Sequence, residues 1–369
     1  MKRKKLILLL FVSFYLCVNG VSKTLVLKTK KMNDLIAVYS FIMNEKEEIF
    51  LFSSKLAKIF KFKPDGTFDK SFCRRGEGPG EINRVFRMFH NPKKGLLYLP
   101  EFYSMAKGKI TIYDSQGNHK GLLKPEISIT HLDRVSKIIF LKDDSYIIVT
   151  QERVDWKPVG KFYVTQDEVL VRCFNPEGKL VSQIFKTYLD DELSNAVRYG
   201  GPRIPFVPSL LVNVTQNGQI AIGKTDENFI SIYDIRGKKV KTIILDIPRE
   251  KLSDELFNKK KKLLVERMTR GSNSRMVNLA RNMIKLEYKP ICNNQFFTAE
   301  SIILSKISEE DDYGYPQKNK LIFFKWNGKK KGERSIDGLV MNHKGDKALI
   351  ITYDRDGNES YKIEPGIFK

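Results

Sequence analysis

The 369-residue sequence is poor in the residues that most often build reactive centres. None of its four histidines pairs with another at the spacing of metal ligands. They are His90, His119, His131 and His343. No nucleophile-elbow motif, P-loop or pair of catalytic carboxylates stands out. We therefore expect no metal and no cofactor, and the sequence assigns no catalytic residue.

Cysteine is also scarce, and its four copies include no C-x-x-C pair. This absence removes support for thiol redox chemistry and for zinc-ribbon sites. Cys17 lies in the N-terminal segment, which leaves Cys73, Cys173 and Cys292 widely spaced. Three cysteines in an oxidising compartment allow at most one internal bridge, so the chain is not a disulfide scaffold.

The N-terminal segment has the composition of an export signal. Met1–Lys5 is basic, and Leu6–Val18 is an apolar run too short for a comfortable membrane span. Small residues near Gly20 predict cleavage there, so residues 1–20 form a signal peptide and the mature chain is periplasmic or extracellular. Two alternatives would place the chain on a membrane: an uncleaved anchor, or lipidation of Cys17. Against lipidation, Leu16 stands where a small residue is required.

Acidic residues are too few to balance the basic ones. Loss of four N-terminal cations with the signal peptide lowers the net charge from +22 to +18. Such a surplus of positive charge can attract nucleic acid, anionic membranes or acidic polysaccharide. The alternative, which we favour, is that the lysines form a solvated surface without a specific partner. The export signal and the lack of aromatic–basic interleaving argue against nucleic acid as a partner.

One pattern recurs five times along the chain. Alternating apolar residues lead into a polar turn that ends in glycine, and another alternating run follows. The copies are Phe60–Phe68, Thr111–Gly117, Arg172–Leu180, Ser231–Gly237 and Phe324–Gly328. Alternation indicates strands with one buried face, and a polar residue followed by glycine closes a hairpin. The first four glycines are 51, 61 and 59 residues apart.

This period suits a blade of four antiparallel strands. Each hairpin follows another β-rich run, such as 48–52 or 95–99. The last unit, from Leu339, is one strand short, and Thr24–Lys28 precedes the first unit without a partner. We therefore predict an all-β fold over residues 21–369: a six-bladed β-propeller closed by the N-terminal strand.

A charged segment interrupts the repeat at residues 248–290, between blades 4 and 5. Leu252, Leu256, Leu264 and Met268 recur at helical spacing, residues 271–274 form a break, and a second helical pattern begins at Met276. These features predict an inserted helical hairpin. Its lysine run, Lys259–Lys262, is a solvated face or an arm that binds an anion or a partner.

The run Phe72–Ile82 resembles secreted six-bladed β-propeller proteins of bacteria that are related to the NHL-repeat propellers. Arg74 and Arg75 precede five residues that match the motif of that family. These are Gly76, Gly78, Pro79, Gly80 and Glu81. Tyr288-Lys289-Pro290, after the insertion, is also similar. The resemblance covers the whole mature chain and implies the fold, but it is silent about function.

Two loops are candidates for ligand contact because each follows the outer strand of one blade and leads to the inner strand of the next. We expect both on one face near the central channel. Their candidate residues are Arg74, Arg75 and Glu81 in the first loop, and Arg198, Tyr199 and Arg203 in the second. The alternative is that these charges form salt bridges within the loops.

A complete repeat scaffold without a catalytic set predicts a monomeric, non-enzymatic binding protein. It would engage a protein, peptide or glycan through the face that carries the crossover loops. The alternative function is a lyase or hydrolase whose residues converge from several blades on the central channel.

Overall fold

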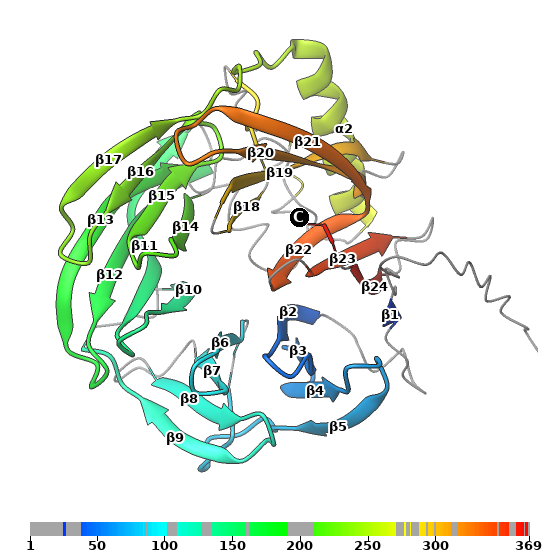
Figure 1. Ribbon diagram of the computed structural model, residues 1–369. Helices are drawn as coiled ribbons and strands as arrows, with labels where there is room; N and C mark the ends of the chain where they lie inside the picture. The colour runs from blue at the N-terminus through cyan, green and yellow to red at the C-terminus, as the bar shows by residue number, and fades with distance from the viewer. Residues whose placement is uncertain are drawn as a thin grey trace, which may run out of the picture.

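The chain folds into a ring of six sheets in a computed structural model (Figure 1). The structure describes residues 25–26, 38–83, 85, 87–101, 109–126, 134–159, 162–190, 210–270, 277, 281, 288–292, 294–298, 300–310, 316–344, 347–353, 359–364 and 366–367.

Each sheet is a blade of four antiparallel strands. Blade 1 contains β2 (Val38–Met43), β3 (Ile49–Ser53), β4 (Lys58–Phe62) and β5 (Phe68–Phe72). Blade 2 contains β6 (Phe89–Asn91), β7 (Leu96–Glu101), β8 (Lys109–Asp114) and β9 (His119–Leu123). Blade 3 contains β10 (Arg134–Phe140), β11 (Tyr146–Val159), β12 (Phe162–Phe174) and β13 (Leu180–Asp190).

The second half of the ring repeats the arrangement. Blade 4 contains β14 (Leu210–Val214), β15 (Ile220–Lys224), β16 (Phe229–Tyr233) and β17 (Lys239–Ile244). Blade 5 contains β18 (Asn294–Phe297), β19 (Ile302–Glu310), β20 (Pro316–Phe324) and β21 (Lys330–Asp337). Blade 6 contains β22 (Leu339–Lys344), β23 (Lys347–Tyr353), β24 (Glu359–Glu364) and β1 (Leu25–Val26).

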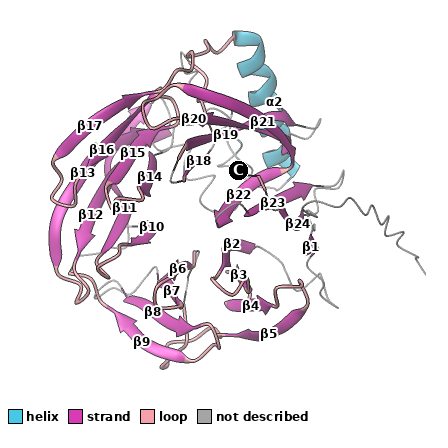
Figure 2. Cartoon of the chain, viewed as in Figure 1, coloured by secondary structure: helices cyan, strands magenta, loops and turns pink. Residues whose placement is uncertain are grey.

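The first strand of each of these blades lies nearest the axis of the ring, and the last strand lies at the rim (Figure 2). The predicted six-bladed propeller of four-stranded antiparallel blades is therefore confirmed. The five predicted hairpins are confirmed as well, at β4–β5, β8–β9, β12–β13, β16–β17 and β20–β21.

The hairpin turns share one local chemistry. In the first, the carboxylate of Asp65 accepts the backbone N–H of Thr67 at 2.9 Å, and Gly66 has a φ of 80°. Asn327 accepts the N–H of Lys329 in the same way, directly before Gly328. In the other three turns the acceptor stands three residues before the glycine; these acceptors are Asp114, Asn175 and Asp234, and each of the glycines has a positive φ. An Asp or Asn side chain that caps the turn and a glycine that takes the left-handed conformation fix the hairpin locally.

The hydrophobic core is divided among six seams between neighbouring blades. Phe50 and Phe52 of blade 1, for example, pack with Leu97 and Leu99 of blade 2. Four similar clusters join blades 2 to 3, 3 to 4, 4 to 5 and 5 to 6. The last cluster joins Ile351 and Ile363 of blade 6 to blade 1, so apolar packing closes the ring.

Hydrogen bonds at the rim connect successive blades. The Lys70 ammonium donates to the carbonyl of Gln116 at 2.8 Å, and the N–H of Asp246 donates to the carbonyl of Gly328 at 2.9 Å. In each case a residue on the outer strand of one blade, or just after it, donates to a turn of the next blade. The other rim bonds run from Glu126 to Gly178, from Ser182 to Ile235 and from Arg334 to Gly366.

Helix α2 (Asp254–Arg270) lies between β17 and β18 in the sequence, as the insertion predicts. The second helical pattern, from Met276, falls almost entirely outside the described residues, so the helical hairpin stays a prediction. Leu25 and Val26 pair with Ile363 and Lys362 of β24. The rest of the predicted strand Thr24–Lys28 lies outside the described residues. Among the residues described, no helix has the length and apolar character needed to cross a membrane.

Candidate functional site

The first crossover loop connects β5 to β6 and contains Arg74, Arg75 and Glu81. Arg74 Nε lies 2.7 Å from Glu81 Oε1, while the Arg74 side chain stays 79% exposed. Glu81 also accepts the backbone N–H of Gly78 at 2.9 Å. This hydrogen bond and the Arg74 charge lower the pKa of Glu81. The structure therefore joins two of the predicted site residues as an ion pair within the loop.

Gly76 has a packing role in the same loop. A Cβ atom at this position would lie 1.9 Å from Glu81 Oε2, so a side chain here would displace the carboxylate. The N–H of Gly76 donates to the carbonyl of Ile82 at 3.1 Å, and the N–H of Ile82 donates to the carbonyl of Arg74 at 3.0 Å. The glycine-rich run is thus a folded crossover rather than a phosphate loop.

Arg75 fixes the position of this loop on the ring. Its Nη2 atom donates to the carbonyl of Lys55 at 3.1 Å, in the turn between β3 and β4. The crossover and the β3–β4 turn therefore lie at the same end of blade 1. We call this end of the ring the crossover face. The remaining predicted site residues, Arg198, Tyr199 and Arg203, lie outside the described residues.

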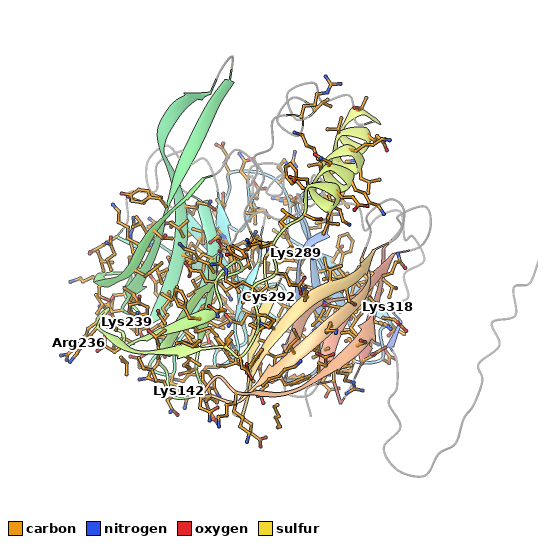
Figure 3. All side chains as sticks on the ribbon, turned by 90° about the horizontal axis from the view of Figure 1, so that it is seen from above. Lys142, Arg236, Lys239, Lys289, Cys292 and Lys318 are labelled. Carbon is orange, nitrogen blue, oxygen red and sulfur yellow. The ribbon has the colours of Figure 1, made fainter. Side chains whose placement is uncertain are left out.

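Two large elements project from the crossover face. Figure 3 shows the long hairpin of β11 and β12 and the helix α2 on the same side of the ring. β11 has 14 residues and β12 has 13, whereas β3 and β4 have five each. Lys142 and Arg236, in turns of blades 3 and 4, lie away from these elements (Figure 3).

At the base of α2, the insertion is fastened to blade 5 by charged groups. Glu250 lies 3.0 Å from the ammonium of Lys289 and 3.0 Å from that of Lys306. The guanidinium of Arg249 stacks over the ring of Tyr288 at 4.0 Å. Both lysine contacts lower the pKa of Glu250. These contacts hold the insertion on the crossover face.

A chain of polar contacts links the innermost strands around the axis. The hydroxyl of Ser40 on β2 accepts the N–H of Met88 at 2.8 Å, just before β6. Arg87 Nη1 donates to the carbonyl of Ser136 on β10 at 2.6 Å. Each bond joins two neighbouring blades at the axial end of their seam.

The chain continues through blades 3, 4 and 5. Lys137 Nζ on β10 donates to the carbonyl of Val212 and, at 2.8 Å, to Asn213 Oδ1 on β14. Asn213 Nδ2 in turn donates to the carbonyl of Gln295 on β18 at 3.0 Å. We call Arg87, Lys137 and Asn213 the axial polar group. Sequence reasoning missed it, although a lysine inside the apolar strand Arg134–Phe140 was a visible signal.

Lys137 is the most perturbed cation of the described chain. Desolvation by the surrounding protein, followed by the charge of Arg87, lowers the pKa of Lys137 to about 8. The residue as a whole nevertheless keeps part of its surface accessible. Among the residues that the structure describes, no carboxylate forms an ion pair with it. The lysine is thus a desolvated cation whose partners are neutral oxygens.

The cysteines are chemically quiet where the structure describes them. Cys73, Cys173 and Cys292 are all free thiols. Burial raises the pKa of Cys73 and Cys173 to about 11 and that of Cys292 to about 12. A thiol with a raised pKa is a poor nucleophile at neutral pH. In the described part of the chain, His, Cys, Asp and Glu side chains do not gather into groups of three that could hold a metal ion.

Comparisons with known proteins support the fold. No protein family and no curated protein matches the sequence. Among solved structures, a protein from Bacteroides fragilis predicted to be exported aligns with a TM-score of 0.50 and 11% identity, covering 93% of this chain and 94% of its own. A member of the DUF4221 family from Bacteroides vulgatus aligns with a TM-score of 0.51 and 10% identity, covering 94% of this chain and 96% of its own.

A virginiamycin B lyase from Staphylococcus aureus aligns at a lower TM-score of 0.43 and 10% identity, over 93% of this chain and 99% of its own. At these identities the neighbours establish the shared fold alone. The chain is therefore similar in architecture to the exported-protein structure and to the DUF4221 structure.

Proposed function

We propose that this chain is an exported binding protein that engages a protein, peptide or glycan through the crossover face. The observation that carries the proposal is the one-sided elaboration of the ring. A blade needs only four short strands and tight turns. The long β11–β12 hairpin and α2 are not needed to close the ring, and both project from the crossover face (Figure 3).

Electrostatics agrees with this choice of face. Arg74 is highly exposed on the crossover loop. At the base of α2, Glu250 contacts Lys289 and Lys306, and its neighbours in the sequence are Arg249 and Lys251. A partner with acidic groups would be attracted to such a surface and oriented on it. We accordingly keep Arg74, Arg75 and Glu81, with Arg198, Tyr199 and Arg203, as candidate contact residues of a monomer.

The test of binding removes the hairpin and leaves the ring intact. Arg153 pairs with Asp167, so replacing residues 154–166 by Asn-Gly joins these partners through a two-residue turn. The shortened chain and the parent chain are screened on arrays of glycans and peptides. We expect ligands of the parent to be lost or at least tenfold weakened in the shortened chain.

The matched control carries Lys142→Glu and Arg236→Glu, two charge reversals away from the crossover face. This variant should bind as the parent does. Equal loss in the control and the shortened chain would contradict binding at the crossover face. Turnover of a bound ligand, abolished by one point substitution, would replace the binding role by the lyase or hydrolase alternative.

Export is supported by the basic N-terminus and the apolar run Leu6–Val18. We propose cleavage after Gly20 and a periplasmic or extracellular location. Mass spectrometry of the chain from its native cell envelope should find a mature N-terminus at Val21. An intact Met1 would contradict cleavage, and a lipid on Cys17 would favour the anchored form.

The finer architecture belongs to the same proposal. We propose that Thr24–Lys28 closes blade 6, that residues 248–290 form a helical hairpin, and that the chain is related to the NHL-repeat propellers. The pairing of Leu25 with Ile363 supports the closure. The glycine-rich run Phe72–Ile82 supports the relationship.

A further inference from the structure

The axial polar group has spare hydrogen-bonding capacity. An ammonium carries three N–H donors. Lys137 uses two of them, toward the carbonyl of Val212 and toward Asn213 Oδ1. Asn213 is itself held by its bond to Gln295, so the ammonium is fixed in place. One donor on a positioned cation remains for a further acceptor.

Lys137 stands close to the axis of the ring. β10 is the innermost strand of blade 3 (Figure 2), and among the described strands only β11 pairs with it. A ligand at the axis would therefore lie beside the strand that carries Lys137. Arg87 binds the carbonyl of Ser136, the neighbour of Lys137, and its exposed side chain adds a second positive charge there.

We propose that Lys137, supported by Arg87 and positioned by Asn213, binds the carboxylate group of a ligand at the axis of the ring. The inference rests on the proposed binding function and names the chemistry that the site would recognise. One donor on the ammonium fits one oxygen of a singly charged group. A phosphate dianion, with three oxygens to satisfy, would need more donors than Lys137 can offer.

Proton linkage distinguishes a lysine that binds a ligand from one that only holds two blades together, because only ligand binding would depend on the protonation of Lys137. A carboxylate stabilises the charged ammonium and raises its pKa, so affinity falls about tenfold per pH unit above the free pKa. That free value is about 8 for Lys137. Among the described residues, Arg87 is the charged group that acts on the Lys137 ammonium. Of the neighbouring strands, β14 has no titratable group, and β6 has His90, whose imidazole lies 3.9 Å from Glu45. β11 carries the phenol of Tyr146.

Two sources share this chemistry, and the experiment separates them. Galacturonate represents acidic sugars, and N-acetyl-dialanine represents peptide carboxyl termini. Galactose and the dipeptide amide are their neutral counterparts, and inorganic phosphate is the competing anion. Binding of each is measured by calorimetry at pH 7.0 and pH 9.5. We expect one carboxylate to bind, its neutral counterpart not to bind, and affinity to be about 30-fold lower at pH 9.5.

Three variants complete the experiment. Lys137→Met should weaken carboxylate binding by about 10- to 100-fold. Lys137→Arg should retain binding without its pH dependence, because a guanidinium stays charged. Lys142→Met, away from the crossover face, is the matched control and should bind as the parent does. Thermal melts without ligand confirm that each variant is folded.

The outcomes that would overturn the axial site differ from those that would overturn the function. Carboxylate binding that survives Lys137→Met, or that shows the same pH dependence in Lys137→Arg, would overturn the axial site. Binding of phosphate alone would overturn it too, as would no carboxylate binding by the parent. If the parent still binds array ligands through the β11–β12 hairpin in these cases, the proposed function stands. Absence of every array ligand would instead contradict the function.

Discussion

Gly328 offers a direct test of how the blades are joined. It closes the β20–β21 turn with a φ of 86°, and its carbonyl accepts the N–H of Asp246 from the preceding blade. A Cβ atom on Gly328 would lie 1.8 Å from the carbonyl oxygen of Ile244. Gly328→Ala therefore strains the turn and forces the two blades apart at the rim.

The expected cost has two parts. A residue with a Cβ atom in the left-handed conformation costs about 1–2 kcal/mol. Loss or distortion of the hydrogen bond to Asp246 adds about 1 kcal/mol. Because the clash is with backbone, which cannot rotate away as a side chain can, we expect Gly328→Ala to lower the free energy of unfolding by the full sum, about 2–3 kcal/mol.

Urea unfolding followed by circular dichroism measures this loss, and Gly95→Ala is the matched control. Gly95 has a φ of 62°, but a Cβ atom at this position would meet nothing within 4 Å beyond its own chain neighbours. Its substitution should cost only the conformational part, about 1–2 kcal/mol. Equal losses for Gly95→Ala and Gly328→Ala would refute the seam argument, because the rim contact would then contribute nothing.

Three further results are expected. Phe324 is fully buried in the seam between blades 4 and 5. The substitution Phe324→Ala should therefore lower the free energy of unfolding by about 3–5 kcal/mol, and a urea midpoint equal to that of the parent would contradict this packing. Native protein should react with Ellman's reagent at pH 8 far more slowly than unfolded protein, because burial raises the pKa of every described thiol, Cys292 most; rapid native reaction would show that the thiols are accessible. Glu81 has a pKa below its usual 4.5, chiefly through the Gly78 N–H, so its contribution to stability is present above pH 4.5 and lost as pH falls further. Urea midpoints of the parent and Glu81→Gln should therefore differ at pH 7 and converge on acidification; a constant gap would refute the assignment.

The blade architecture was predictable because it depends on local chemistry repeated along the chain. Each Asp or Asn side chain caps its own turn, and each turn glycine takes a positive φ, so the hairpins can be recognised in short windows. The last unit was recognisably one strand short for the same reason. The length of the β11–β12 hairpin was less visible, because alternation shows that a strand exists more clearly than where it ends.

The candidate site was only partly predictable. Arg74 and Glu81 lie close in sequence, and the structure joins them in one loop. The axial polar group comes from Arg87, Lys137 and Asn213, whose successive members are 50 and 76 positions apart in the sequence. Their proximity depends on the order of blades around the ring, which no local spacing encodes. A lysine within an apolar strand was a hint, but only the closed ring supplies its partners.

The rim bonds have a consequence for how far such sequences can diverge. In all five described cases, the acceptor is a main-chain carbonyl of the next blade's turn, from Gln116 to Gly366. Every amino acid carries that oxygen, so a turn substitution that preserves the backbone conformation leaves the acceptor in place, whereas Gly328→Ala would disturb it through the clash with Ile244. Chains that retain only about a tenth of their residues in common can thus keep the same circular assembly, while the loops above it are free to acquire new ligands.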